Sequence, residues 1–309
     1  MPATPPSMPT PVLEDKSINE NAGNMMRAVE NGTGDMVSPD KSRQNARLLE
    51  SGIARIKAKS LDVHGLRKLQ SLMRENKVSY TDNKFDAMVM GLFGYLKDPL
   101  AELKPTKALD TKTQILATIR VLLKKERVNF QPHVAAGLDA VLTARAACQN
   151  RAHMASGLEL LADELVLLGD ASDMVMSLTQ RLRDCTDMTP EGCRTLSAGM
   201  YMLRSVLERR GGGAYEPVDG EIERLAELAR RGIESADTGV RKDAVELCVG
   251  LHARIGESRF WDALKNAKEE PKNLITYYIA RRQQEKGPAA ARAAVEHLAG
   301  GRTGGRDVN

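Results

Sequence analysis

Apolar residues recur at a spacing of three and four along most of the chain between residues 41 and 284. The clearest example is the stretch VRKDAVELCVGLHARIGE, in which Leu247, Leu251 and Ile255 share one stripe and polar residues cover the remainder. This spacing places side chains on one face of an α-helix. The pattern therefore predicts amphipathic helices, each of which has to bury its apolar stripe against a neighbour.

The predicted helices come in pairs that are separated by short breaks. Six pairs across about 245 residues average roughly 41 residues each, which is the length of HEAT and armadillo units. Stacked units bury their stripes against each other and leave one long face for binding, so we predict an all-α fold, an α-solenoid of about six HEAT repeats. A compact helical bundle is the alternative. The predicted pairs are residues 41–60 and 61–76, 85–96 and 110–127, 132–147 and 150–168, 172–183 and 190–210, 219–234 and 238–255, and 258–267 and 272–284.

Capping residues and breaks set the expected helix ends and the domain limits. Ser60 or Asp62 is expected to cap the second helix, and Asp110 to cap the helix that follows the break DPLAELKPTK. Residues 1–38 are rich in Pro, Asn, Gly, Ser and Thr and are expected to form a disordered linker. We therefore expect a helical-repeat domain over residues 39–286, followed over residues 287–309 by a small Ala-rich helix and a tail.

Composition supports the all-α class and adds a modest charge. Only 4% of the 309 residues are aromatic, whereas 42% are apolar and Leu, Ala, Met, Arg and Glu are abundant. The formal net charge is +4, and residues 1–37 hold two basic and five acidic residues, which leaves +7 on the remainder. A mildly basic domain suits an acidic partner, although such a charge also serves solubility alone.

The chain offers little that could support catalysis. Its histidines are scattered singly, its four cysteines lack CxxC spacing, and GGGA at residues 211–214 lacks the Lys-Ser or Lys-Thr of a phosphate-binding loop. No apolar run reaches the roughly 18 residues of a membrane span. We expect no enzyme activity, no metal, no cofactor and no membrane partner, and a cytosolic or nuclear location for a protein whose cysteines are reduced thiols near the core.

The stretches VRKDAVELCVGLHARIGE and PKNLITYYIARRQ together resemble the end of TOG domains, particularly those of the CLASP family. TKTQILATIRVLLKKER and SGIARIKAKSLDVHGLRKLQSLMREN also look like fungal CLASP sequence, so the likeness covers residues 41–286. It implies the C-terminal TOG-like domain of a microtubule-stabilising protein that acts in the cytoplasm, on the cytoskeleton and at the mitotic spindle. Its partners would be tubulin or kinetochore and spindle adaptors, with self-association as a homodimer.

The resemblance also implies a binding edge formed by the turns within helix pairs, which contact tubulin in tubulin-binding members of the family. These turns are expected at residues 59–62, 104–110, 149–151, 186–194, 237–242 and 267–272. The plain alternative for each charge is a solvated loop. The basic residues that would form a cationic strip are Lys59, Lys107, Lys112, Arg151, Arg194, Arg241, Lys242 and Lys272, of which Arg241 and Lys242 match the family's last-repeat contact most closely.

The first turn, KSLDVHGLRK, lacks the tryptophan that tubulin-binding TOG domains usually place there, and Trp261 is expected in the core. A HEAT adaptor that docks other proteins without binding tubulin is therefore the second hypothesis. Nucleic-acid binding is disfavoured, because the basic residues alternate with acidic ones and lack interleaved aromatics.

Overall fold

The computed structural model describes residues 39–75, 80, 81, 83–149, 152–186, 188–209 and 215–300, with side chains described between residues 40 and 285. The chain divides into residues 1–42 and residues 43–309, and the fold described below is that of the second unit. Within the described ranges, the regular structure consists of helices, and no strand is present. The expected all-α class is thus confirmed.

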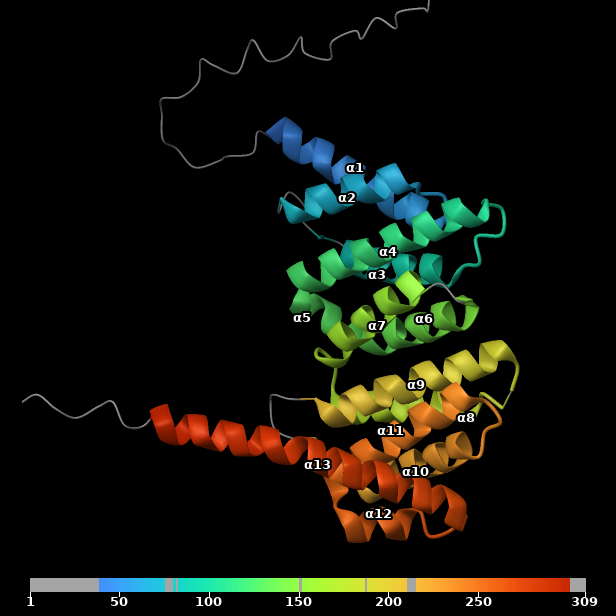
Figure 1. The fold of residues 1–309 in the computed structure, drawn as a ribbon. Coiled ribbons are helices and arrows are strands. Elements are labelled where there is room, and N and C mark those ends of the chain that lie inside the picture. Colours follow the sequence, from blue (N-terminus) through green and yellow to red (C-terminus); the bar gives the residue numbers. More distant parts are fainter. Residues whose placement is uncertain are drawn as a thin grey trace, which may run out of the picture. The chain divides into compact units, whose positions relative to one another are not determined.

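The helices form six consecutive antiparallel pairs in the described part of the chain (Figure 1). A short helix, α5 (Arg127–Phe130), and a 3-10 turn, η1 (Gln131–His133), lead from the second pair into the third. The pairs are α1 (Pro39–Lys57) with α2 (Val63–Arg74), α3 (Lys84–Lys97) with α4 (Pro105–Lys125), α6 (Val134–Ala147) with α7 (Ala152–Val166), α8 (Ala171–Arg183) with α9 (Pro190–Glu208), α10 (Asp219–Ile233) with α11 (Thr238–Ile255), and α12 (Glu257–Ala263) with α13 (Glu269–Gly300).

Successive pairs stack in the order of the sequence. Helix α2 packs on α4, α4 on α7, α7 on α9, α9 on α11 and α11 on α13, while α3 packs on α6, α6 on α8 and α8 on α10. All the extensive helix contacts between described residues join helices of one pair or of neighbouring pairs. The fold is therefore a solenoid of HEAT-like repeats, and the alternative of a bundle that packs distant helices together is wrong.

The predicted apolar stripes form the core. Leu247, Cys248 and Leu251 of α11 are almost completely buried, as the three-and-four spacing required. Trp261 departs from its expected core position, because it is only half-buried and its neighbour Phe260 is fully buried instead. The two rings meet edge to face with their centroids 5.0 Å apart, so the tryptophan covers the margin of the core.

Two helices begin or end elsewhere than predicted. Helix α4 starts at Pro105, so Asp110 lies inside the helix and does not cap it. Proline suits the first helical position because its missing N–H would have no partner there. Helix α13 continues to Gly300, where two separate helices had been expected on either side of Gly287 and Pro288. Pro288 lies inside this helix and removes one of its backbone hydrogen bonds.

A buried carboxylate fixes the start of α10. Glu221 is 3% exposed and accepts hydrogen bonds from the Ser172 hydroxyl, from the Tyr215 hydroxyl at 2.7 Å and from the Val218 N–H at 2.9 Å. Burial alone would raise the pKa of Glu221, but these three donors stabilise the charged form and hold the pKa below its ordinary value. The carboxylate therefore links α8, the loop before α10 and the first turn of α10.

Arginine side chains bind the carbonyl groups at the ends of helices in neighbouring pairs. Arg231 of α10 donates to the carbonyls of Leu182, Arg183 and Cys185 at the end of α8, at 2.5, 3.1 and 3.2 Å. Arg209 donates to the carbonyl of Gly169 at 2.7 Å. The last carbonyls of a helix lack partners within the helix, so a guanidinium group stabilises them both as a donor and as a charge at the negative end of the helix dipole.

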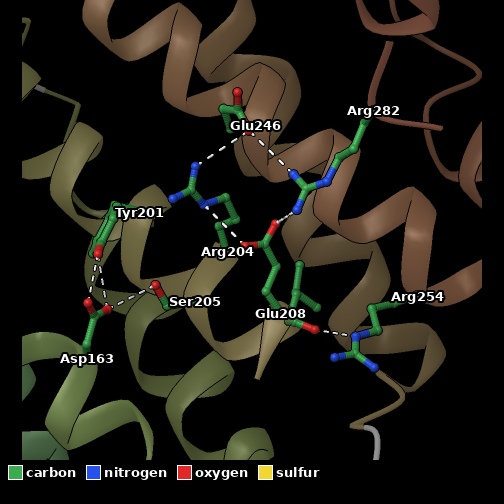
Figure 2. A network of polar contacts seen from close by, with 9 residues as sticks. Asp163, Tyr201, Arg204, Ser205, Glu208, Glu246, Arg254 and Arg282 are labelled. Carbon is green, nitrogen blue, oxygen red and sulfur yellow. Dashed lines mark hydrogen bonds and ion pairs between the residues drawn. The ribbon is translucent and has the colours of Figure 1, made fainter. Parts of the chain in front are cut away.

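Ion pairs also link the second helices of the last pairs, as Figure 2 shows. The Nη1 of Arg204 in α9 lies 3.5 Å from Oε2 of Glu246 in α11. The Nη1 of Arg282 in α13 lies 3.5 Å from the same oxygen, and Arg282 also pairs with Glu208 of α9. The hydroxyl of Tyr201 donates to Asp163 of α7 at 2.9 Å. Polar contacts thus connect α7, α9, α11 and α13 in series.

Candidate binding edge at the turns within helix pairs

The turns within the pairs lie along one side of the repeat stack, on the right in Figure 1. This follows from the alternation of helix direction, which places the connections between pairs on the opposite side. We define the turn edge as the described residues within 58–62, 98–107, 148–149, 188–194, 234–242 and 264–272, which are the turns together with the first residues of most of the helices that follow them. Seven of the eight predicted cations lie within described segments at or beside this edge.

Lys59 in the first turn pairs with Asp98 in the second. Lys59 adopts a left-handed backbone conformation with φ of 54°. The carboxylate of Asp98 also accepts the N–H of Leu100 at 2.9 Å, and the hydrogen bond from Lys59 together with that from Leu100 lowers the pKa of Asp98. Lys59 therefore joins two successive turns.

A cavity of about 850 Å³ lies between the first and second turns. Leu61, Tyr95, Leu100 and Leu103 contribute its apolar surface, and Asp62, Asp98 and Glu102 are among its charged residues. Asp62 caps α2 by accepting the N–H of Gly65 at 2.9 Å, which confirms one of the two predicted caps. The described first turn, residues 59–62, thus borders a cavity and contains no aromatic side chain.

Lys107 and Lys112 lie on the first two turns of α4 and not in the preceding loop, because α4 begins at Pro105. Lys107 is exposed on the turn edge, whereas Lys112 is half-buried. Lys112 contributes to the positive potential that lowers the pKa of Asp98. Of the two, Lys107 is the better placed to meet a partner.

Arg194 is a structural residue as well as a cation of the edge. It lies in α9, and its Nε donates to the carbonyl of Ala146 at the end of α6, at 2.7 Å. Arg151, the neighbouring candidate from the third turn, lies outside the described residues. Helix α9 begins at Pro190, as predicted, with Thr189 as its cap, so the last residues of the expected turn 186–194 belong to the helix.

Arg241 and Lys242 differ although they are adjacent. Both lie in the first turn of α11, which begins at Thr238 after the cap Asp237. The Nη1 of Arg241 donates to the carbonyls of Ser235 and Ala236, each at 2.8 Å, and so fastens the turn that precedes the helix. Lys242 is exposed, and its charge acts on Asp243, whose pKa is raised by burial and moderated by Ser197 and Lys242.

Lys272 lies in the first turn of α13, where its Nζ is 3.1 Å from Glu269. This pair is local and partly exposed, and such pairs contribute little to stability. Three of the described candidate cations therefore contribute least to the stability of the fold, namely Lys107, Lys242 and Lys272. The contacts of Arg209 and Arg231 with backbone carbonyls could not be predicted from the sequence, because their partners lie 40 to 49 residues away.

The described residues include no group of three or more His, Cys, Asp or Glu side chains that could hold a metal ion. In the same residues, no helix has the length and apolar character needed to cross a membrane. The turn edge itself carries nine basic and eight acidic residues on a framework of packed helices.

The stack of helix pairs defines a helical-repeat domain, and sequence comparison narrows this class. No protein-family model matches the chain. It is 54% identical over 288 residues to Protein STU1 of Gibberella zeae, covering 93% of this chain and 25% of that protein. It is 47% identical over 317 residues to Protein STU1 of Chaetomium globosum, covering 93% and 28%, and 46% identical over 304 residues to Protein stu-1 of Neurospora crassa, covering 91% and 27%.

These similarities show that the chain belongs to the CLASP family, of which the STU1 proteins are fungal members, and confirm the family resemblance of the sequence. The chain spans about a quarter of the length of the curated relatives it matches.

Proposed function

We propose that this chain is a non-enzymatic binding domain of a CLASP-type microtubule-associated protein, and that its turn edge docks on tubulin. In this proposal the whole protein stabilises dynamic microtubules and supports the mitotic spindle, and it acts in the cytoplasm and on the cytoskeleton. The observation that carries the proposal is the similarity to STU1 proteins over 93% of this chain.

The charges of the turn edge support the proposed mode of docking. Lys107 and Lys242 are exposed, and Lys272 has only a local partner across one helical turn. Cations along a rigid edge attract an acidic surface, speed its approach and orient it, and this attraction weakens with added salt. The stacked helices hold the cations in a fixed order, as a docking surface requires.

Co-sedimentation with microtubules, together with gel filtration in the presence of free tubulin, tests the proposal. The domain is expected to pellet with microtubules at low ionic strength and to be released as salt is added. A domain that neither pellets with microtubules nor co-elutes with tubulin would overturn the proposed partner.

A second candidate function is a HEAT adaptor that docks kinetochore or spindle proteins without contacting tubulin. The first turn favours it, since residues 59–62 contain no aromatic side chain and border a cavity of about 850 Å³. Buried aromatic anchors usually supply much of the affinity of a protein interface. Failure to bind tubulin, combined with capture of a purified spindle protein, would support this role.

A further inference from the structure

A cavity of about 480 Å³ lies in the middle of the turn edge, where the third, fourth and fifth pairs meet. Its volume is within the roughly 300 to 1,000 Å³ range of ligand pockets in proteins. It therefore exceeds the space needed by a single small ion. The residues that line it come from α6, α7, α9, α11 and the adjoining turns, and include Arg145, Ala152, Cys193, Arg194, Ser197 and Gly239.

Two guanidinium groups give this cavity its charge. Arg194 uses Nε for the carbonyl of Ala146 at 2.7 Å, and Arg145 uses Nη1 for the carbonyl of Cys148 at 3.4 Å. Each arginine therefore keeps further donors that make no hydrogen bond with other described residues. Guanidinium groups bind carboxylates through paired N–H donors, a geometry that a lysine cannot provide.

Two carboxylates lie close to the arginines, because Asp237 lines the cavity and the hydroxyl of Ser197, also in the lining, donates to Asp243. Asp237 is the only described acidic residue in its lining, and its carboxylate accepts the N–H of Val240 at 2.9 Å as the cap of α11. The first turns of α7, α9 and α11 also contribute to the lining, and the dipole of each helix places partial positive charge at its start. The described lining itself holds two guanidinium groups and one carboxylate.

We propose that this cavity, with Arg145 and Arg194 as its cationic groups, receives a carboxylate side chain from an acidic segment of the partner protein. We name it the arginine pocket, lined by the residues given above. The inference rests on the proposed function in one respect, which is that the partner approaches the turn edge. It adds a specific receptor in the middle of that edge to the general attraction of the exposed lysines.

Filling the pocket with an internal carboxylate tests the proposal without removing either arginine. Ala152 is exposed, is the first residue of α7 and lines the pocket. Ala152→Glu places a competing carboxylate there, at a helix start where acidic residues are favoured, so folding should be preserved. Ala152→Gln is the matched control of nearly the same size without charge.

The probe is a capped hexaglutamate peptide, titrated into the ¹⁵N-labelled full chain at low ionic strength and followed by NMR. We expect saturable shifts for the amides of Cys193 and Gly239, with smaller effects of capped hexaglutamine and of inorganic phosphate. Ala152→Glu and Arg145→Gln should each weaken binding by about tenfold or more, as expected for loss of a charge-assisted hydrogen bond. Ala152→Gln should weaken binding less than Ala152→Glu does, because it fills the same space without a competing charge.

Three results would overturn the arginine pocket. They are the absence of saturable binding, equal binding by Ala152→Glu and Ala152→Gln, and phosphate binding as tight as that of the peptide. Arg181→Gln, on α8 and paired with Asp139 at 3.3 Å, serves as a control outside the pocket. Microtubule co-sedimentation without peptide binding would defeat only this inference, whereas peptide binding without microtubule binding would defeat only the proposed function.

Discussion

The contact between Arg231 and the end of α8 gives a sharp test of how the repeats are held together. The substitution Arg231→Gln removes three hydrogen bonds to backbone carbonyls at distances of 2.5 to 3.2 Å. Hydrogen bonds from a charged donor contribute about 1.5 to 3 kcal/mol each, but the half-buried carbonyls regain water when the donor is lost. We therefore expect the free energy of unfolding to fall by about 2 to 4 kcal/mol in total.

The neighbouring Arg230 provides the control. Its guanidinium pairs with the exposed carboxylates of Glu227 and Glu234 at 2.7 and 3.3 Å, on the surface of its own helix. Arg230→Gln should cost about 0 to 1 kcal/mol, as is usual for surface pairs. Both variants remove one positive charge from the same turn of α10. A difference between them in the free energy of unfolding therefore reflects the group that each arginine binds and not the net charge.

Thermal unfolding followed by circular dichroism measures the difference. In a domain of this size about 1 kcal/mol shifts Tm by roughly 2 to 4 °C, so Arg231→Gln should lower Tm by about 4 to 16 °C and Arg230→Gln by less than about 4 °C. Equal shifts for the two variants, or a larger shift for Arg230→Gln, would refute the idea that arginine contacts with helix ends hold neighbouring pairs together.

Three further predictions follow from particular side chains. Lys242→Glu should weaken microtubule binding and leave Tm nearly unchanged, whereas Arg241→Gln should lower Tm because it loses two backbone contacts, and equal melting curves would contradict this. Because the pKa of Glu221 is lowered in the folded chain, its carboxylate contributes stability above the ordinary pKa of 4.5, and this stability is lost as the pH falls through the folded pKa. Glu221→Gln should therefore make Tm fall less steeply with pH below 4.5. An unchanged dependence of Tm on pH in this variant would refute the prediction. Leu247→Ala should cost about 2 to 5 kcal/mol in urea denaturation, and a cost under about 1 kcal/mol would contradict its burial.

Periodicity predicted the fold well wherever a helix buries one clear stripe. The limits predicted for α11, residues 238–255, match the structure, because Asp237 caps its start and Gly256 follows its end with φ of 81°. The predicted start of α4, residue 110, was wrong because its sequence contains two residues that favour a helix start. Proline at position 105 begins the helix, and Asp110 lies more than one turn further along.

The location of the candidate site was predictable from the sequence, but the roles of its individual residues were not. The order of helices and turns was enough to place the cations near one edge. Sequence could not separate Arg241, which binds the carbonyls of its own turn, from Lys242, which is exposed. Nor could it bring Arg145 and Arg194 to one cavity, since that requires the spacing between the third and fourth pairs.

The most direct test of the account compares the turn edge with the opposite side of the repeat stack in microtubule co-sedimentation. Lys107→Glu combined with Lys242→Glu reverses two exposed cations of the turn edge, while Lys124→Glu combined with Lys125→Glu reverses two exposed cations at the opposite end of α4. With folding of both variants verified by circular dichroism, the account predicts that only the first pair of substitutions abolishes pelleting at low salt. Equal loss of binding in both variants, or loss only in the second, would contradict the claim that the turn edge is the binding surface.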